Sequence, residues 1–373
     1  MKRIPFLKPN LPKKDAYIAY LSQIDESRVY SNYGPLNSRL ENRLLSECFE
    51  GQGAITTVNN ATTGLMLAIS QTMRRQGKYA LMPSFTFAAT PLAAMWCGLD
   101  PYFIDIRQED WCMDEEILTE TLSKLGEEVA VVIPYATFGT HLNLTYYSSL
   151  QNSGMPVVVD AAPGFGTIKN NVQFGKQFPG TVVFSFHATK PFGIGEGGMV
   201  YSGNPKTISL IRQAGNFGFS ESKEATTQGL NGKMSEYAAA IGLATLDDFP
   251  RKRQARCDVH RLYIGYFEDA GLFDEGWRFH KTEGQIPYQF ISILCPKRQS
   301  SADIVDQLRK SLIESRTYFC PACHQQPRFV HLPHSPLPIT EDVAQRILSL
   351  PLWEEMKPRD VARVVESINM VDH

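Results

Sequence analysis

The sequence TVVFSFHATKPFGIGEGGMVY, residues 181–201, joins an apolar run to a lysine and a cluster of glycines. The run TVVFSF predicts a strand, and Lys190 follows it after three residues. A lysine that a strand end holds among glycines can lose its hydration and act as a nucleophile, for example by binding an aldehyde cofactor as a Schiff base. Taken alone, Lys190 fits a surface turn between two hairpin strands better. The glycines are Gly193, Gly195, Gly197, Gly198 and Gly203.

A second stretch supplies a partner for this lysine. VVVDAAPGFG, residues 157–166, predicts a strand buried on both faces of a parallel sheet, with Asp160 at its carboxyl end. Open α/β sheets bind ligands at that end, although Asp160 could instead cap a following helix. A lysine and a carboxylate on strand ends are what pyridoxal 5′-phosphate (PLP) requires. The lysine binds the aldehyde, and the carboxylate keeps the pyridine nitrogen protonated.

The bulk composition excludes several classes of protein. The chain has 373 residues, of which 43% are hydrophobic, so it can bury a large core in about two domains. Lysine and arginine number 37 against 39 acidic residues, and a net charge of −2 gives no sign of a nucleic-acid or membrane partner. The basic N-terminus lacks the apolar core of a signal peptide, and no run approaches the roughly 18 apolar residues of a membrane span. We therefore expect a cytoplasmic protein.

The seven cysteines are scattered and do not resemble a disulfide framework. Cys320, Cys323 and His324 match the C-x-x-C-H pattern of covalent haem attachment. The lack of an export signal, together with the evidence for a different cofactor, argues against haem. His331 and His334 follow closely, so a zinc site is an alternative for this region.

Strand and helix signals alternate between residues 59 and 203. Such alternation predicts βαβ units and a mainly parallel sheet flanked by helices. The expected helices are 62–75, a segment ending at Gly98, 114–125 and 146–152, and the expected strands are 80–82, 101–106 and 129–135, followed by the Asp160 and Lys190 strands.

The pattern changes after about residue 232. A long alanine-rich helix is expected over residues 233–249, continuing over 251–273. We therefore expect a large domain over residues 1–250 and a smaller α+β domain over residues 251–373. The other elements expected in the smaller domain are a strand at 289–294 and helices at 301–314, 342–350 and 358–370.

The cofactor phosphate needs backbone donors at the start of a helix. VNNATTGLMLAI, residues 58–69, offers them at Ala61 and Thr62, and Ser185 adds a hydroxyl from the lysine strand. The same segment could be only a well-capped helix start. Phe85 or Phe87 could cover the cofactor ring, although either could equally belong to the core.

Together these segments resemble the DegT/DnrJ/EryC1/StrS family of PLP-dependent nucleotide-sugar aminotransferases. The resemblance extends from about residue 4 to residue 368, and it is the order and spacing of the motifs that make it specific. It implies fold type I, a mainly parallel seven-stranded sheet flanked by helices, with a smaller C-terminal α+β domain. The motifs in register are YGP (33–35), NNATTGL (59–65), PSFTFAAT (83–90), DAA (160–162), SFHATK (185–190), EGG (196–198), GLNGKMSEYAAAIG (229–242) and LPITEDVAQRILSLPL (337–352).

The resemblance also implies residue roles. The catalytic pair is Lys190, which forms the Schiff base, and Asp160, which pairs with the pyridine nitrogen. Asn231 matches an asparagine that a neighbouring subunit sends to the phosphate, which implies a homodimer with shared active sites. The full set of implied cofactor-binding residues is Ala61, Thr62, Phe87, Asp160, Ser185, Lys190 and Asn231.

The sequence departs from the family pattern at two places. Asn60, Ala61 and Thr62 stand where serine, glycine and threonine are usual. Pro163 replaces a glutamine or histidine that touches the cofactor ring, so this contact is in doubt.

The expected reaction is transfer of the amino group of L-glutamate to a nucleotide-linked 4-keto-6-deoxy or 3-keto hexose. The amino sugar would serve lipopolysaccharide O-antigen, another surface polysaccharide or a glycosylated metabolite. Some family members carry histidine in place of the lysine and are dehydratases, so Lys190 favours transamination. A PLP-dependent dehydratase or lyase and a non-catalytic binding protein are the alternatives. Candidate substrate contacts are Tyr33, His187, Tyr318 and His324.

Overall fold

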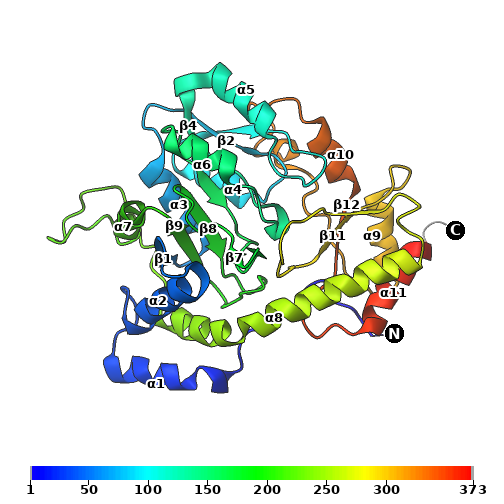
Figure 1. Cartoon of the computed structure of the whole chain (residues 1–373), viewed down its shortest axis with the longest axis horizontal. Coiled ribbons are helices and arrows are strands. Elements are labelled where there is room, and N and C mark those ends of the chain that lie inside the picture. The colour runs from blue at the N-terminus through cyan, green and yellow to red at the C-terminus, as the bar shows by residue number, and fades with distance from the viewer. Residues whose placement is uncertain (1, 371–373) are drawn as a thin grey trace.

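The computed structural model describes residues 2–370 and contains a seven-stranded sheet (Figure 1). Two groups of strands, β1-β9-β8-β5 and β3-β2-β4, are joined by parallel bridges from Val132 to Val157 and from Tyr135 to Asp160. β9 is antiparallel to both of its neighbours, and all the other pairings are parallel. The expected mainly parallel seven-stranded sheet is therefore confirmed. The strands are β1 (Ala54–Val58), β2 (Tyr79–Pro83), β3 (Asp100–Ile104), β4 (Val129–Val132), β5 (Val158–Asp160), β8 (Thr181–Ser185) and β9 (Gly198–Ser202).

Successive residues of a strand point to opposite faces of the sheet. Both faces of this sheet carry apolar side chains, and helices cover each face. In β8, Val182 and Phe184 pack into one apolar cluster, and Val183 packs into a second cluster on the other face. The first cluster is completed by α2 (Pro35–Phe49), α5 (Glu115–Leu125), α6 (Thr145–Asn152) and the start of α8 (Glu236–Asp269). The second is completed by α3 (Ala61–Thr72), α4 (Ala89–Trp96) and α7 (Pro205–Ala214). Strands buried on both faces explain the continuous apolar runs of the sequence.

The C-terminal part is a small antiparallel sheet with its own apolar cluster. The expected helix over residues 342–350 is wrong: the helix ends at Arg346, and residues 347–350 form a strand. That strand pairs with β11 in register, Ile291 opposite Leu350, and all four of its residues are buried. A short apolar run can form either a helix or a strand, and here pairing with β11 makes it a strand. The elements are β10 (Arg278–Phe279), β11 (Ile291–Leu294), α9 (Ser301–Lys310), α10 (Pro338–Arg346), β12 (Ile347–Leu350) and α11 (Pro358–Asn369).

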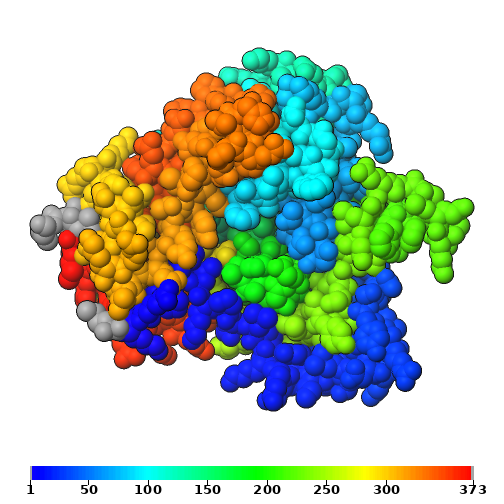
Figure 2. All heavy atoms as spheres, turned by 180° about the vertical axis from the view of Figure 1, so that it is seen from behind, coloured from blue at the N-terminus to red at the C-terminus, as the bar shows by residue number. Residues whose placement is uncertain are grey.

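The helix α8 connects the two parts of the molecule (Figure 1). It runs for 34 residues and passes through Pro250, so the expected division at residue 250 falls inside one continuous helix. Ile4 packs in the apolar cluster of the C-terminal part and pairs with Ile313. Figure 2 shows the N-terminal segment, in dark blue, on the surface beside the orange part of the chain. The division into domains 1–250 and 251–373 stays a prediction.

The remaining α-helix and strands are α1 (Ile18–Ser27), β6 (Ile168–Lys169) and β7 (Val172–Gln173). Within residues 2–370, no helix is both long and apolar enough to cross a bilayer.

Candidate active site

A cavity of about 700 Å³ lies at the carboxyl ends of β5 and β8 and at the first residues of α3. Asp160 is the last residue of β5, and Lys190 lies in the turn that follows β8. Both line the cavity, so the two strand ends that the sequence singled out meet there. Adjacent parallel strands bring their carboxyl ends to one edge of the sheet, which is why residues thirty positions apart converge.

Asp160 accepts two hydrogen bonds and is only 3% exposed. The hydroxyl of Thr90 donates to Oδ2 at 2.6 Å, and the backbone N–H of Ala162 donates to Oδ1 at 3.0 Å. Burial raises the pKa of Asp160, while these two hydrogen bonds and the charge of Lys190 lower it. The carboxylate thus lies in a site where a buried cation beside it would be strongly stabilised.

Lys190 has the character of a nucleophile at near-neutral pH. Burial lowers its pKa to about 8, and the charge of Asp160 acts in the opposite direction. Its Nζ donates to Oε1 of Gln289 at 3.0 Å. Because the neutral amine is the reactive form, a pKa near 8 leaves a useful fraction of the lysine ready to react.

The first turn of α3 also lines the cavity. Asn60 caps this helix, and its Oδ1 accepts the backbone N–H of Thr63 at 2.8 Å. Ala61 and Thr62 line the cavity beside the hydroxyl-bearing Ser185. The start of a 12-residue helix favours an anion such as a phosphate. Asn60 is therefore a helix cap, and the helix that it caps begins at the cavity.

The structure distinguishes the two candidate phenylalanines. Phe87 lines the cavity, and 59% of its surface is exposed. Phe85 is fully buried and makes edge-to-face contacts with Trp111, Phe138 and Phe319. Phe87 is thus the ring available to a planar ligand, and Phe85 belongs to the core.

Asn231 lies outside the cavity of its own chain. Its side chain is exposed, and its backbone carbonyl accepts a hydrogen bond from Asn59 at 3.4 Å. The other six predicted cofactor-binding residues all line the cavity. Pro163 lines it as well, so this wall presents no side-chain donor at that position.

Two of the four candidate substrate contacts reach the cavity, namely His187 and Tyr318. Tyr33 does not: its ring lies 3.6 Å from the guanidinium of Arg212, and its hydroxyl donates to the Arg212 carbonyl at 3.1 Å. His324 does not line it either, and its Nδ1 is 2.7 Å from the hydroxyl of Ser84. Both residues instead make contacts between segments that are distant in the sequence, Tyr33 with Arg212 and His324 with Ser84.

The C-x-x-C-H region shows no metal site. Cys320 is exposed and Cys323 is buried, with its Sγ donating to the carbonyl of Thr86 at 3.3 Å. His331 and His334 are both exposed. No group of three or more histidine, cysteine, aspartate or glutamate side chains that could hold a metal occurs within residues 2–370.

Several cavity residues carried no local signal in the sequence. Leu7, Gln289 and Phe319 line the cavity from segments distant from the main motifs. Tyr135 and Phe138 follow β4 and also line the cavity; Tyr135 is the last residue of the strand predicted over 129–135. Strand positions could have suggested Tyr135 and Phe138, because they lie at the carboxyl end of the sheet. Leu7, Gln289 and Phe319 come together with the cavity only through tertiary packing.

These features fit PLP. Lys190 would hold its aldehyde, Asp160 its ring nitrogen, Phe87 its ring face, and Ser185 with the start of α3 its phosphate. When bound, the cofactor supplies an electron sink for the carbon next to an amino group. The chain itself supplies a buried carboxylate, a lysine with a lowered pKa and a cavity large enough for cofactor and substrate.

Known proteins match this chain over nearly its whole length. The DegT/DnrJ/EryC1/StrS aminotransferase family matches residues 13–369. A crystal structure from Bacillus cereus, assigned as a PLP-dependent aminotransferase, is 49% identical with a TM-score of 0.97 and covers 98% of this chain and 100% of its own. Protein Rv3402c of Mycobacterium tuberculosis is 33% identical, over 98% of this chain and 89% of its own length.

A further relative is the dTDP-4-amino-4,6-dideoxy-D-glucose transaminase of Escherichia coli. It is 28% identical to this chain, and the match covers 98% of each protein. The family match, the shared fold and the cavity agree on one cofactor and one class of reaction. The chain therefore belongs to the DegT/DnrJ/EryC1/StrS family of aminotransferases and is a PLP-dependent enzyme.

Proposed function

We propose that the protein transfers the amino group of L-glutamate to the keto carbon of a nucleotide-linked hexose, of the 4-keto-6-deoxy or 3-keto type. The product is an amino sugar for a surface polysaccharide, such as O-antigen, or for a glycosylated metabolite. The observation that carries the proposal is the convergence of Lys190 and Asp160 in one cavity at the start of α3. Support for the sugar comes from the Escherichia coli relative, which is named a transaminase of an amino sugar linked to dTDP.

The dimensions of the cavity suit a substrate larger than an amino acid. Its volume of about 700 Å³ lies within the range of small-molecule sites that enclose a ligand of drug size. His187, Glu196 and Tyr318 line it and can offer hydrogen bonds to hydroxyl groups. These groups are suitable partners for the hydroxyls of a hexose.

Lys190 performs the proton transfers in this proposal. As a neutral amine, its Nζ removes the proton from the α-carbon of glutamate, and it later delivers a proton to the former keto carbon of the sugar. In its ionised form, Asp160 stabilises positive charge at the cofactor ring. Its hydrogen bonds from Thr90 and Ala162 keep it oriented during both half-reactions.

The purified enzyme with PLP is mixed with L-glutamate and then with dTDP-4-keto-6-deoxy-D-glucose, and the products are separated by mass spectrometry. We expect an amino-sugar nucleotide and 2-oxoglutarate in equal amounts. A sugar product that has lost water, without matching 2-oxoglutarate, would support the dehydratase alternative. If glutamate leaves the absorbance of the bound cofactor unchanged, the proposed donor is wrong.

We also propose that the active enzyme is a homodimer in which Asn231 enters the cavity of the partner. Asn231 lies at the end of a loop, residues 216–231, that protrudes from the body of the molecule (Figures 1 and 2). Phe217 and Phe219 on this loop are 44% and 39% exposed. Exposed aromatic side chains on a protruding loop favour a protein interface.

Mixed dimers test this arrangement. Chains with Lys190→Ala and chains with Asn231→Ala are each expected to be inactive or weakly active alone. If Asn231 acts across the interface, each mixed dimer contains one intact site, and an equal mixture regains roughly a quarter of the wild-type sites. Active-site titration and turnover measure this recovery. If Asn231 acts within its own chain, mixing restores nothing, and the shared-site proposal is lost.

A further inference from the structure

Gln289 is the polar side chain that the structure places directly against the reactive amine. Its Oε1 accepts a hydrogen bond from Nζ of Lys190 at 3.0 Å. Its Nε2 lies 3.4 Å from the hydroxyl of Thr189, the residue before the lysine. Both ends of the amide are therefore engaged, and this fixes which end faces Lys190. Gln289 itself lines the cavity.

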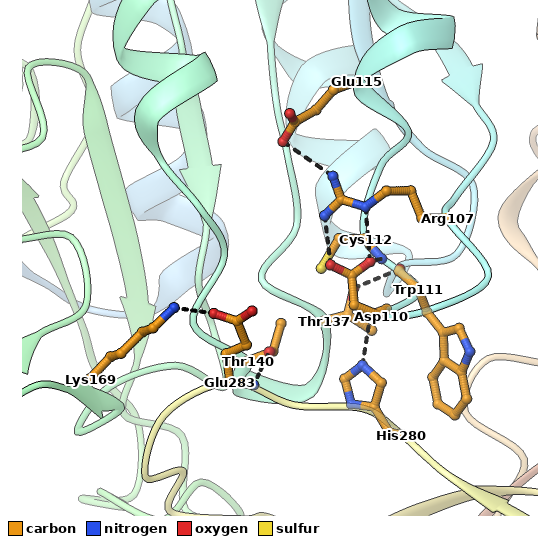
Figure 3. Close-up of polar contacts among 10 residues, drawn as sticks. All are labelled: Arg107, Asp110, Trp111, Cys112, Glu115, Thr137, Thr140, Lys169, His280 and Glu283. Carbon is orange, nitrogen blue, oxygen red and sulfur yellow. Dashed lines mark hydrogen bonds and ion pairs between the residues drawn. The ribbon is translucent and has the colours of Figure 1, made fainter.

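The segment that carries Gln289 is held by the loop after β3 and by the β6-β7 hairpin (Figure 3). His280 lies with its Nε2 2.7 Å from the carbonyl of Asp110, and its ring stacks on Trp111 with centroids 4.5 Å apart. Further along, Glu283 forms an ion pair with Lys169. These contacts hold residues 280–283 in place. Gln289, two residues before β11, therefore lies in an anchored segment and not in a free loop.

The residues directly after Asp160 that line the cavity provide no equivalent group. Pro163 lines the cavity after Asp160 but has neither a side-chain donor nor an N–H. The other amide side chain that lines the cavity, Asn60, is engaged in capping α3 through its Oδ1. Among the residues that line the cavity, Gln289 is therefore the amide within reach of the lysine.

We infer that Gln289 is a positioning residue for Lys190, whose amide oxygen holds the free amine in place whenever the lysine is not bound to the cofactor. This inference rests on the transaminase chemistry of the proposed function, and it is independent of which sugar is used. Transamination frees the lysine in every half-reaction, and a free four-carbon side chain has several rotamers. A fixed acceptor 3.0 Å away restricts those rotamers and keeps Nζ where proton transfer occurs.

A second consequence concerns the charge of the amine. An amide oxygen stabilises the ammonium form modestly, a carboxylate would stabilise it strongly, and an apolar group would not stabilise it. Variants of Gln289 should therefore move the protonation midpoint of Lys190 in opposite directions. The other titratable groups lining the cavity are the same in all variants, namely Asp160, Glu196, His187, Tyr135 and Tyr318.

The experiment uses the full-length protein freed of cofactor. PLP is added back over a range of pH, and the rate of its attachment to Lys190 is followed by absorbance. The wild-type midpoint is expected near the lowered pKa of about 8. Gln289→Glu should raise the midpoint by about one to three pH units. Gln289→Met, which keeps the length of the side chain, should lower it by about one unit.

Gln285→Met is the matched control, because Gln285 is exposed, lies on the same segment and does not line the cavity. Its midpoint should equal that of the wild type. Shifts in the same direction for Gln289→Glu and Gln289→Met, or no shift in either, would overturn the inference. If one variant does not fold, Gln289→Asp or Gln289→Ala provides the same contrast. A wild-type protein that attaches no PLP would instead contradict the function itself.

Discussion

The two walls of the cavity differ in origin and in task. One wall belongs to the large sheet, where Asp160 and Lys190 follow neighbouring buried strands. The other is assembled from Leu7, Gln289 and Phe319, which lie far apart in the sequence. The sheet wall holds charged groups that need exact placement, and a buried parallel sheet is a rigid support for them. The assembled wall shapes and closes the space, and its Gln289 contacts the amine of Lys190. At Leu7 and Phe319, in contrast, substitutions can alter the substrate without destroying the chemistry.

Lys190→Ala tests the sheet wall with the largest expected effect. Because the nucleophile and the proton carrier are the same atom, turnover with L-glutamate and a keto-sugar nucleotide should fall by about 10⁴-fold or more. The absorbance band of lysine-bound PLP should also disappear. Lys124→Ala, at an exposed position at the end of α5, is the control and should behave as the wild type. Full activity in Lys190→Ala would remove the lysine from the mechanism.

Asp160→Asn keeps the shape of the side chain and removes its charge. Turnover should fall by about 10²–10³-fold, because a preorganised charge at the cofactor ring is lost. The protein should remain folded, since the amide oxygen can still accept from Thr90. Steady-state kinetics and circular dichroism measure the two expectations. Asp258→Asn, at an exposed position of α8, is the control. Equal losses in both variants would mean that Asp160 has no special role.

The same substitution should change the pH profile of Lys190. The charge of Asp160 raises the pKa of Lys190, against the larger lowering by burial. Removing that charge should therefore shift the midpoint of PLP attachment below about 8. At pH 7 a larger fraction of the lysine would be neutral, so attachment should become faster there even though turnover is slower. A midpoint that rises in Asp160→Asn would show that the two groups do not interact as inferred.

The smallest expected effect on the cofactor comes from Phe87→Ala. Comparing it with Phe85→Ala separates stacking on the cofactor ring from packing in the core. Phe87 is largely exposed, so its loss should weaken PLP binding by roughly 2- to 10-fold and leave the melting temperature nearly unchanged. Phe85 is fully buried, so its loss should reduce the free energy of unfolding by about 3–5 kcal/mol. Equilibrium dialysis of PLP and thermal unfolding measure the two quantities. Similar melting temperatures for both variants would contradict this distinction.

Local patterns were sufficient wherever neighbouring residues determine the structure. The β-branched run ending at Asp160 predicted a buried strand, and the element was confirmed as β5. The apolar spacing of residues 62–75 predicted a helix, and the element was confirmed as α3 from Ala61 to Thr72. Strand burial and helix capping depend on residues within a few positions of each other, and so a single sequence displays them.

Local patterns failed where a distant partner decides. Residues 347–350 form a strand because β11 pairs with them, although the same run could extend the preceding helix. Tyr33 packs against Arg212 and does not line the cavity of its own chain. Both outcomes depend on contacts with residues far away in the sequence. The local sequence around residues 347–350 and around Tyr33 does not reveal those contacts.

The sequence by itself determined the alternating sheet and helices, the lysine and the aspartate at strand ends, and the helix start that can receive a phosphate. These features follow from the spacing of apolar residues, from helix-capping residues and from the residues at strand ends. All of these are properties of short segments. Only the tertiary structure decided that Phe85 belongs to the core, that Asn231 does not enter the cavity of its own chain, and that Gln289 meets Lys190. Those facts depend on packing between segments up to about a hundred residues apart, such as Lys190 and Gln289, and packing is settled by the whole fold at once.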